Sequence, residues 1–309
     1  MTMKRLSLLL AILTAFPCLA ADLPTAIRSV IPSQVQQIIN VDYRRMRGSE
    51  TAMAMKAKLL PPNMKQFEDA LKAVVPEKDI DQITLVSFRN KDNGLQMIGI
   101  AQGTFPQKTV NLRLTKQKIK GSKVEGATLY PMPGGLQMMF LDDWTMLFGD
   151  QSAVEAALEA RDGSGKSLNN NAEVADLIAS VDQGTVWSVL DTAGTQTMMK
   201  SALGTAADLA EYDSVKKRLM GSRYSMDFNS GVDFNLSVQT SDNVTASTLS
   251  SILKAGLMFK KASANPTEKA AIDNTTVDSD SSRLVVHFKA DDKSFQQLLE
   301  SPMFASVVR

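Results

Sequence analysis

Two short apolar runs, each ending in an aspartate, organise this sequence. Residues 34–43 are QVQQIINVDY, and residues 186–191 are VWSVLD. Apolar, largely β-branched side chains that stop at a carboxylate are typical of a strand that ends at a polar turn. Similar successions of predicted helices and strands follow the two runs. We therefore expect one α+β module to occur twice, over residues 21–183 and over residues 184–309.

The first module contains two strong local signals. Pro61 and Pro62 separate two helical segments, because proline cannot continue a helix. Asp92-Asn93-Gly94 predicts a hairpin turn, since Asn-Gly tolerates the positive φ that such turns require. The predicted helices are Glu50–Leu60, Asn63–Val75 and a segment that begins with a capping box at Ser152; the predicted strands are 83–88, 95–103, 127–132, 136–141 and 144–148. The segment Thr109–Ile119 alternates like a strand, but its place in the module favours a helix.

The second module repeats this order of elements. Asn265, followed by Pro266, predicts a capped helix start. The predicted helices are 196–203, 206–219, 245–259, the segment after Asn265 and a last one capped by Asp292; the predicted strands are 186–190, 224–228, 232–238 and 284–288. Each module thus follows a β-α-β-β-α-β order, which predicts two ferredoxin-like antiparallel sheets with helices on one face. The sheets could form separate domains or join edge to edge.

One region resembles a segment that recurs in exported bacterial proteins of unassigned activity built from repeated modules. The likeness extends over most of the chain after residue 20, and it implies an architecture without naming any catalytic residue. The residues that carry it are Leu147-Phe148-Gly149-Asp150, Ala153-Val154, Ala156-Ala157-Leu158, Arg161-Asp162-Gly163, Ser167-Leu168 and Asn171.

The first twenty residues have the pattern of a cleaved secretory signal. Lys4 and Arg5 precede a largely apolar run from Leu6 to Leu19, and small residues precede a cut after Ala20. This run is shorter than the ~20 residues that a membrane span needs. A lipid anchor on Cys18 is the alternative, although Pro17 stands where a small residue is normally required. We expect export to the periplasm or the extracellular space.

Composition excludes several classes of function. The 309 residues are 44% hydrophobic, with 34 basic and 33 acidic residues, one histidine and one cysteine. Cleavage after Ala20 would leave 32 basic and 33 acidic residues and no cysteine. Such a near-neutral chain has no charge pattern for nucleic acid, and it cannot depend on disulfides. Residues 252–259 are interrupted by Lys254 and Gly256, so no later segment predicts a membrane span.

Two motifs resemble enzyme signatures but lack essential parts. Gly163-Ser-Gly-Lys-Ser167 resembles the end of a phosphate-binding loop, but Ala160 occupies the place of the first glycine, and a helix precedes the loop. Ser251 and Lys254 match the Ser-x-x-Lys of penicillin-recognising enzymes, and Ser241-Asp242-Asn243 matches their second motif. Their order is reversed, and no Lys-Thr-Gly follows.

The remaining candidate residues are carboxylates, a histidine and methionines. Asp42 and Asp191 could form a catalytic or calcium-binding pair, but strand-end aspartates usually bond to local backbone. Asp142 and Asp143 should point to opposite faces. His287 alternates with apolar residues and is predicted on a sheet face without partners. Methionine thioethers could bind Cu(I) or line an apolar site, although core packing is expected for Met53, Met55, Met97, Met132, Met138, Met139, Met146, Met198 and Met199.

These observations favour an exported, non-enzymatic binding or envelope-associated protein. It would recognise a partner protein or an apolar ligand through a sheet face or a groove between the modules, without cofactor, metal or nucleic acid. We assign no catalytic residue, metal ligand or specific ligand-binding residue. The alternatives are a hydrolase using two of Asp42, Asp142, Asp143 and Asp191, which would have to converge within about 10 Å, and a methionine-based copper protein.

Overall fold

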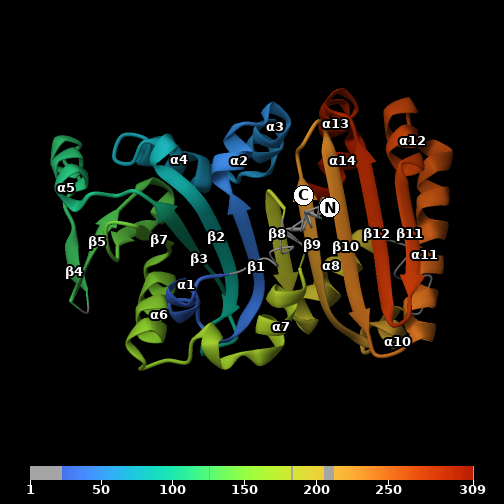
Figure 1. Ribbon diagram of the computed structural model, residues 1–309, viewed down its shortest axis with the longest axis horizontal. Coiled ribbons are helices and arrows are strands. Elements are labelled where there is room, and N and C mark those ends of the chain that lie inside the picture. The colour runs from blue at the N-terminus through green and yellow to red at the C-terminus, as the bar shows by residue number, and fades with distance from the viewer. Residues whose placement is uncertain (1–22, 125, 182–183, 205–211, 309) are drawn as a thin grey trace, which may run out of the picture.

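A single twelve-stranded antiparallel sheet runs the length of the protein (Figure 1). The computed structural model describes residues 23–124, 126–181, 184–204 and 212–308. The strand order is β11-β12-β10-β9-β8-β1-β2-β3-β7-β6-β5-β4. The strands are β1 (Val35–Asp42), β2 (Ile80–Arg89), β3 (Leu95–Gly103), β4 (Ser122–Val124), β5 (Ala127–Pro131), β6 (Gln137–Phe140), β7 (Thr145–Gly149), β8 (Val186–Leu190), β9 (Leu219–Asp227), β10 (Val232–Thr240), β11 (Thr275–Asp280) and β12 (Arg283–Ala290).

The pairing of β1 with β8 joins the two parts of the chain. Gln37 lies opposite Leu190, and Val41 lies opposite Val186. On one side of this seam the strand order is β1-β2-β3-β7-β6, and on the other side it is β8-β9-β10-β12-β11. The sheets are therefore joined edge to edge, which the sequence had left open.

Most helices cover one face of the sheet, called here the helical face. One hydrophobic cluster on this face includes Phe148 and Val232. Val238, six residues after Val232 on β10, points to the same face, because side chains an even number of residues apart on a strand share a face. The second cluster, which contains Val238, therefore lies on the helical face as well. The helices of this layer are α2 (Tyr43–Arg47), α3 (Glu50–Leu59), α4 (Pro62–Leu71), α5 (Gln107–Lys116), α8 (Thr192–Leu203), α10 (Tyr212–Lys216), α11 (Asn243–Ser263), α12 (Pro266–Asp273), α13 (Asp292–Leu299) and α14 (Pro302–Val308).

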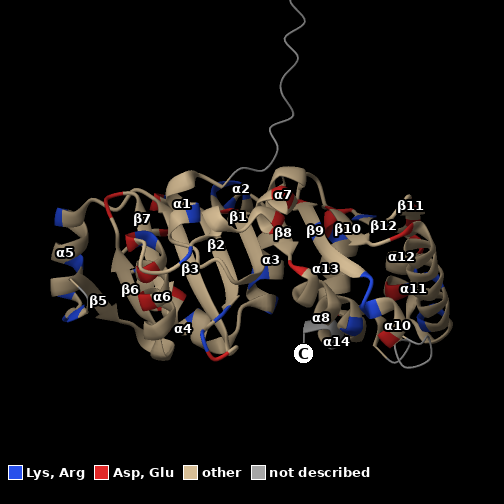
Figure 2. Ribbon diagram, turned by 90° about the horizontal axis from the view of Figure 1, so that it is seen from below, with Lys and Arg blue, Asp and Glu red and all other residues tan. Residues whose placement is uncertain are grey.

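On the other face, the helices of the described residues cover the strands of the first half of the chain and the adjacent β8. There α1 (Thr25–Ser29), α6 (Gln151–Asp162) and α7 (Ala172–Ser180) pack on Ile38, Val86 and Trp187. Over β10 to β12 this face carries mostly polar side chains, and no helix lies in front of these strands in Figure 1. We call this surface the open face. Acidic and basic residues are interspersed over the elements seen in Figure 2, without a long single-sign surface.

Two parts of the predicted fold class need correction. In a ferredoxin-like module the βαβ units are split, so another strand lies between the two strands that a helix connects. Here β1 pairs directly with β2, although α2, α3 and α4 connect them, and the strand order is β1-β2-β3-β7. The helices also lie on both faces of β1, β2 and β3 rather than on one. The α+β class and the antiparallel sheet are confirmed.

Several predicted boundaries differ from those in the structure. The helix α6 begins after Asp150, so Ser152 lies inside it, and Asp291 rather than Asp292 caps α13. The strand predicted from Tyr224 already begins at Leu219. The sequence also missed β11 and α14. Part of the helix predicted over 206–219, the signal segment and residues 182–183 beside the module boundary lie outside the described residues.

Candidate functional site

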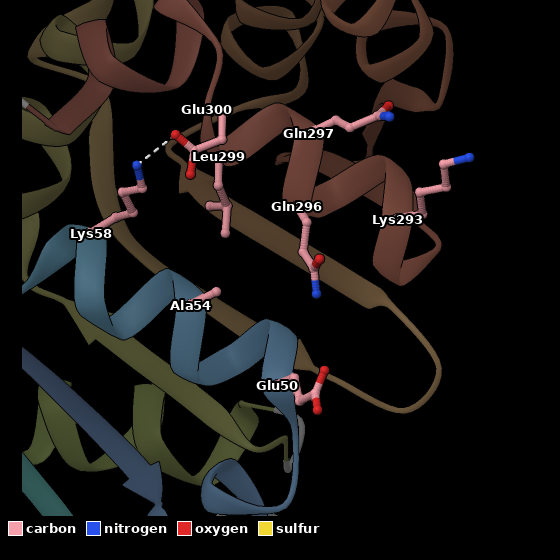
Figure 3. A pocket seen from close by; sticks show the side chains of 8 residues that line it. All are labelled: Glu50, Ala54, Lys58, Lys293, Gln296, Gln297, Leu299 and Glu300. Carbon is pink, nitrogen blue, oxygen red and sulfur yellow. Dashed lines mark hydrogen bonds and ion pairs between the residues drawn. The ribbon is translucent and has the colours of Figure 1, made fainter.

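A groove crosses the seam between the two halves of the chain, between α3 and α13 (Figure 3). Its volume is about 510 Å³. Residues four apart share a helix face, which places Glu50, Ala54 and Lys58 of α3 along one wall. The residues of the opposite wall are spaced so that they lie on one side of α13. The full lining is Glu50, Ala54, Lys58, Lys293, Gln296, Gln297, Leu299 and Glu300.

The capping residues of the two helices fix the walls of this groove. The Ser49 hydroxyl accepts a hydrogen bond from the Ala52 N–H at the start of α3. The Asp291 carboxylate accepts bonds from the N–H and the hydroxyl of Ser294 at the start of α13, and these bonds lower the pKa of Asp291. Both helices therefore begin at defined residues, which sets the direction of their groove-facing side chains.

Polar contacts join the two helices that form the walls of the groove. Lys58 and Glu300 form an ion pair with a distance of 2.7 Å between Nζ and Oε2, drawn in Figure 3. Near the other end, the Thr51 hydroxyl donates to Asp292, and the Gln296 amide lies 3.4 Å from the same hydroxyl. Four charged residues and two glutamines thus line the groove, and its apolar lining consists of Ala54 and Leu299.

The methionines do not line this groove. Met138 and Met146 are fully buried in the core of the helical face, whereas the neighbouring Met139 points to the opposite core. Met97, 38% exposed, lies on β3. The groove therefore lacks the methionine lining expected for an apolar-ligand site. The buried thioethers of Met138, Met139 and Met146 lie on two different faces of the sheet and do not form one cluster.

The four candidate aspartates do not converge. Asp42 caps α2 by accepting the Arg45 N–H, and Asp191 caps α8 by accepting the Gly194 N–H. They lie at opposite ends of the β1–β8 pair, separated by six residues of β1 or about 20 Å. Asp142 and Asp143 lie in the β6–β7 turn, three strands or about 14 Å from β1. A carboxylate hydrolase built on these residues is therefore not supported.

His287 lies on the open face, as expected, but it has partners. Its Nε2 is 3.0 Å from the Asp233 carboxylate on the adjacent strand β10, and Lys289 approaches the same carboxylate at 3.7 Å. The prediction that His287 stands without partners is wrong, because its ring, opposite Asn235 in the register, reaches Asp233 two residues away on β10. No group of three metal-ligating His, Cys, Asp or Glu side chains occurs among the described residues.

A cluster of titratable residues at the C-terminal end of β1 was not predicted from the sequence. The buried Tyr43 hydroxyl donates to Glu77 and accepts from Lys56 Nζ at 2.7 Å, and Lys56 also binds Glu68 at 2.8 Å. Burial, together with Glu77, raises the pKa of Tyr43, so its phenol stays protonated at neutral pH. Burial would raise the pKa of Glu68, but Lys56 and Lys72 outweigh it and lower that pKa.

This cluster joins three helices and does not resemble a catalytic base. Tyr43 starts α2, Lys56 lies on α3, and Glu68 lies on α4. Because the phenol is protonated and the lysine is paired with a carboxylate, neither group is poised to remove a proton from a substrate. No local sequence pattern brings these residues together.

The two enzyme-like motifs have structural roles. Gly163 ends α6 in the left-handed conformation, with φ of 82°, so the loop follows a helix C-terminus. The Ser251 hydroxyl donates to the Ser247 carbonyl, whereas Lys254 pairs with Asp278. The lysine is thus directed away from the serine. Among the described helices, none combines the length and the apolar character needed to cross a bilayer.

Comparison with known proteins identifies a likeness of fold. The first crystal form of TP0453, a protein of the bacterium Treponema, superposes with a TM-score of 0.53 at 10% identity, over 90% of this chain and 97% of that chain. Its third crystal form gives a TM-score of 0.48 at 9% identity, over 88% and 96%. No protein-family model matches the sequence, and no curated protein matches it.

Proposed function

We propose that this chain is an exported, non-enzymatic binding protein that recognises an extended segment of a partner protein in the groove between α3 and α13. The observation that carries this proposal is the composition of the groove. About 510 Å³ of open space is lined by two acidic residues, two lysines and two glutamines where the halves of the chain meet.

This lining suits a polypeptide better than an apolar small molecule. Glutamine amides both donate and accept hydrogen bonds, which complements the N–H and C=O groups of an extended backbone. Glu50 and Lys293 can pair with charged side chains of either sign, and among the described residues the Lys293 charge acts on the Asp291 carboxyl, whose pKa it helps to lower. Small-molecule sites are usually more apolar and more enclosed.

We also infer that the two halves of the chain derive from one duplicated module. The shared strand order on either side of the β1–β8 seam supports this, as does the β-hairpin that forms the second and third strand of each half. The groove would then be an interface that arose when two copies were joined. Its walls come from α3 of the first half and α13 of the second.

Peptide binding can be tested with a matched pair of variants. Peptides would be selected from a random library on the purified chain without residues 1–20, and their affinities measured by fluorescence anisotropy. Ala54→Arg places a long cation in the groove and should weaken binding at least tenfold. Val244→Arg, at a residue 71% exposed on the distant α11, should leave binding unchanged. Equal affinity for both variants, or no selected peptide, would contradict the proposal.

Export rests on residues 1–20 and needs a separate test. Expression of the full chain in a bacterium should yield a protein outside the cytoplasm whose mass corresponds to residues 21–309, and deletion of residues 2–20 should retain it in the cytoplasm. A protein that keeps Cys18 and partitions with membranes would instead support the lipid anchor. Release of the cleaved protein by washing would distinguish peripheral association from a soluble state.

A further inference from the structure

Residues 107–124 form a basic end of the molecule, called here the basic tip. They comprise α5, the loop after it and the edge strand β4, and they lie at the end of the sheet opposite β11 (Figure 1). This segment contains six basic residues and no acidic one, whereas the whole chain has a formal charge of +1. The basic tip is therefore a local exception to the mixed charges of the other elements in Figure 2. Its basic residues are Lys108, Arg113, Lys116, Lys118, Lys120 and Lys123.

The lysines of the basic tip are not neutralised within the part of the chain that the structure describes. All five are exposed, and none of the ion pairs between described residues involves them. Arg113 donates to the Val74 carbonyl at 3.1 Å, which leaves its formal charge uncompensated. By contrast, Lys58 and Lys254 are paired with carboxylates. The positive charge of the tip is consequently available to a partner.

Two carboxylates lie near the start of α5, and backbone N–H groups bind both of them. Asp143 accepts from the Gln107 N–H at 3.0 Å, and Asp142 accepts from the Trp144 N–H at 2.7 Å. Negative charge is favourable at this end of a helix because of the helix dipole. The helix is about 15 Å long, and Lys116 with the lysines after it lies at its other end. The two signs of charge are therefore separated along the tip.

An exposed leucine lies among the basic residues of α5. Leu112 is 72% exposed, whereas Val110 and Leu114 on the inward side of the helix are buried in the core of the helical face. Lys108 and Lys116 are each four residues from Leu112, so they flank it on the same helix face. A central apolar residue with charged residues around it is the usual arrangement of a protein–protein contact, in which the centre is desolvated and the rim stays hydrated.

We propose that the basic tip binds an acidic surface of a partner protein, with Leu112 entering an apolar depression in that surface. The lysines attract carboxylates over about 8–10 Å at ordinary ionic strength and raise the rate of association. Leu112 adds the burial of an apolar side chain, which selects partners with a matching depression. This contact does not rest on the groove between α3 and α13, because β2, β3, β7, β6 and β5 lie between β4 and the seam.

Other occupants account for fewer features of the basic tip. A sulfated polysaccharide can neutralise the lysines but offers no apolar site for a leucine. A helix that enters a membrane interface keeps a broad apolar face for lipid, whereas Val110 and Leu114 already pack against the sheet. A second copy of the chain would bring two basic tips together, and lysines on an edge strand such as β4 are a usual protection against that pairing.

Binding to a defined acidic probe tests the proposal. A fluorescein-labelled peptide of five Glu-Glu-Leu repeats would be titrated with the chain without residues 1–20, and a peptide of five Glu-Glu-Ser repeats would serve as the comparison. The leucine peptide should bind at least fivefold more tightly than the serine peptide. Because exposed charges are screened by salt, both affinities should fall at least tenfold between about 20 and 200 mM NaCl.

Matched variants separate the basic tip from net charge. Lys116→Glu combined with Lys120→Glu should weaken the binding of both peptides at least tenfold. Lys200→Glu combined with Lys269→Glu makes the same change in net charge at exposed lysines of α8 and α12, and it should change the affinities less than twofold. Leu112→Ser should abolish the preference for the leucine peptide while leaving the affinity for the serine peptide unchanged. Thermal unfolding would verify that each variant is folded.

Four outcomes would overturn the proposal. Equal losses in the two double variants would show that net charge alone governs binding, and equal affinities for the two peptides would remove the role of Leu112. Tighter binding to heparin, or to vesicles of phosphatidylglycerol and phosphatidylcholine, without an effect of Leu112→Ser would assign the basic tip to a polysaccharide or a membrane. Loss of binding in Ala54→Arg would place the peptides in the groove instead, so failure of this proposal is distinguishable from failure of the groove proposal.

Discussion

Replacing Gly99 with alanine tests whether the continuous sheet unfolds as one unit. An alanine Cβ at this position of β3 would lie 2.1, 2.3 and 2.6 Å from three ring atoms of Phe148 on β7. Unstrained carbon contacts are about 3.5–4.0 Å. The ring cannot turn away easily, because Phe148 is 5% exposed and stacks on Phe67 of α4 with ring centroids 4.8 Å apart.

The expected cost follows from these contacts. Overpacking a filled core typically costs about 1–3 kcal/mol, and disturbing an aromatic stack costs about 0.5–1.5 kcal/mol. Gly99→Ala should therefore lower the free energy of unfolding by about 2–4 kcal/mol. For a chain of this size, that corresponds to a decrease in Tm of roughly 4–8 °C.

The informative measurement is made on the other side of the seam. Trp187 lies on β8 and is 3% exposed, whereas Trp144 is 62% exposed. In a Trp144→Phe background, fluorescence reports mainly on Trp187. We expect one thermal transition, lowered by Gly99→Ala as calculated, because β1 pairs directly with β8. An unchanged Trp187 transition would show that the halves unfold independently and would refute this reasoning.

Two controls separate the steric clash from a general glycine effect. A Cβ at Gly165 would have no neighbour closer than 3.4 Å, so Gly165→Ala should change the free energy of unfolding by less than about 0.5 kcal/mol. Phe148→Leu removes the ring that the new methyl group meets. In that background Gly99→Ala should cost about 1–2 kcal/mol less than in the parent chain. Additive effects would mean that the two residues do not touch.

Four further predictions concern the titratable cluster and a helix cap. Lys56→Met should lower the free energy of unfolding at pH 7 by about 1–2 kcal/mol in urea titrations, because Glu68 and the phenol lose a cation. Because the pKa of Glu68 is lowered in the fold, its carboxylate stabilises the protein above the ordinary pKa of 4.5, and this stabilisation is lost as the pH falls through the folded pKa. Glu68→Gln should therefore flatten the acid side of a profile of stability against pH. Because the pKa of Tyr43 is raised by burial and Glu77, Tyr43→Phe should leave the absorbance change at 295 nm between about pH 9 and 11 unaltered. Asn265→Ala removes the capping box of α12 and should lower stability by about 0.5–2 kcal/mol by calorimetry, whereas Ser263→Ala should have little effect.

The sequence predicted best the elements that depend on adjacent residues. Asn93 adopts a φ of 59° in the predicted hairpin, and the break at Pro61 and Pro62 separates α3 from α4 as expected. The N-cap predicted at Asn265 is also confirmed, and Glu268 completes it to a capping box. Each of these signals acts within four residues, so backbone preferences decide the outcome before tertiary contacts form.

The sequence did not predict where distant elements meet. The register of β1 against β8 joins residues about 150 positions apart, and the groove wall pairs Lys58 with Glu300. Neither contact has a local pattern. The strand β11 was missed because Val277 is its one buried residue, which leaves too little alternation to identify a strand. The candidate site consequently could be named from the sequence only as a groove between modules, without its residues.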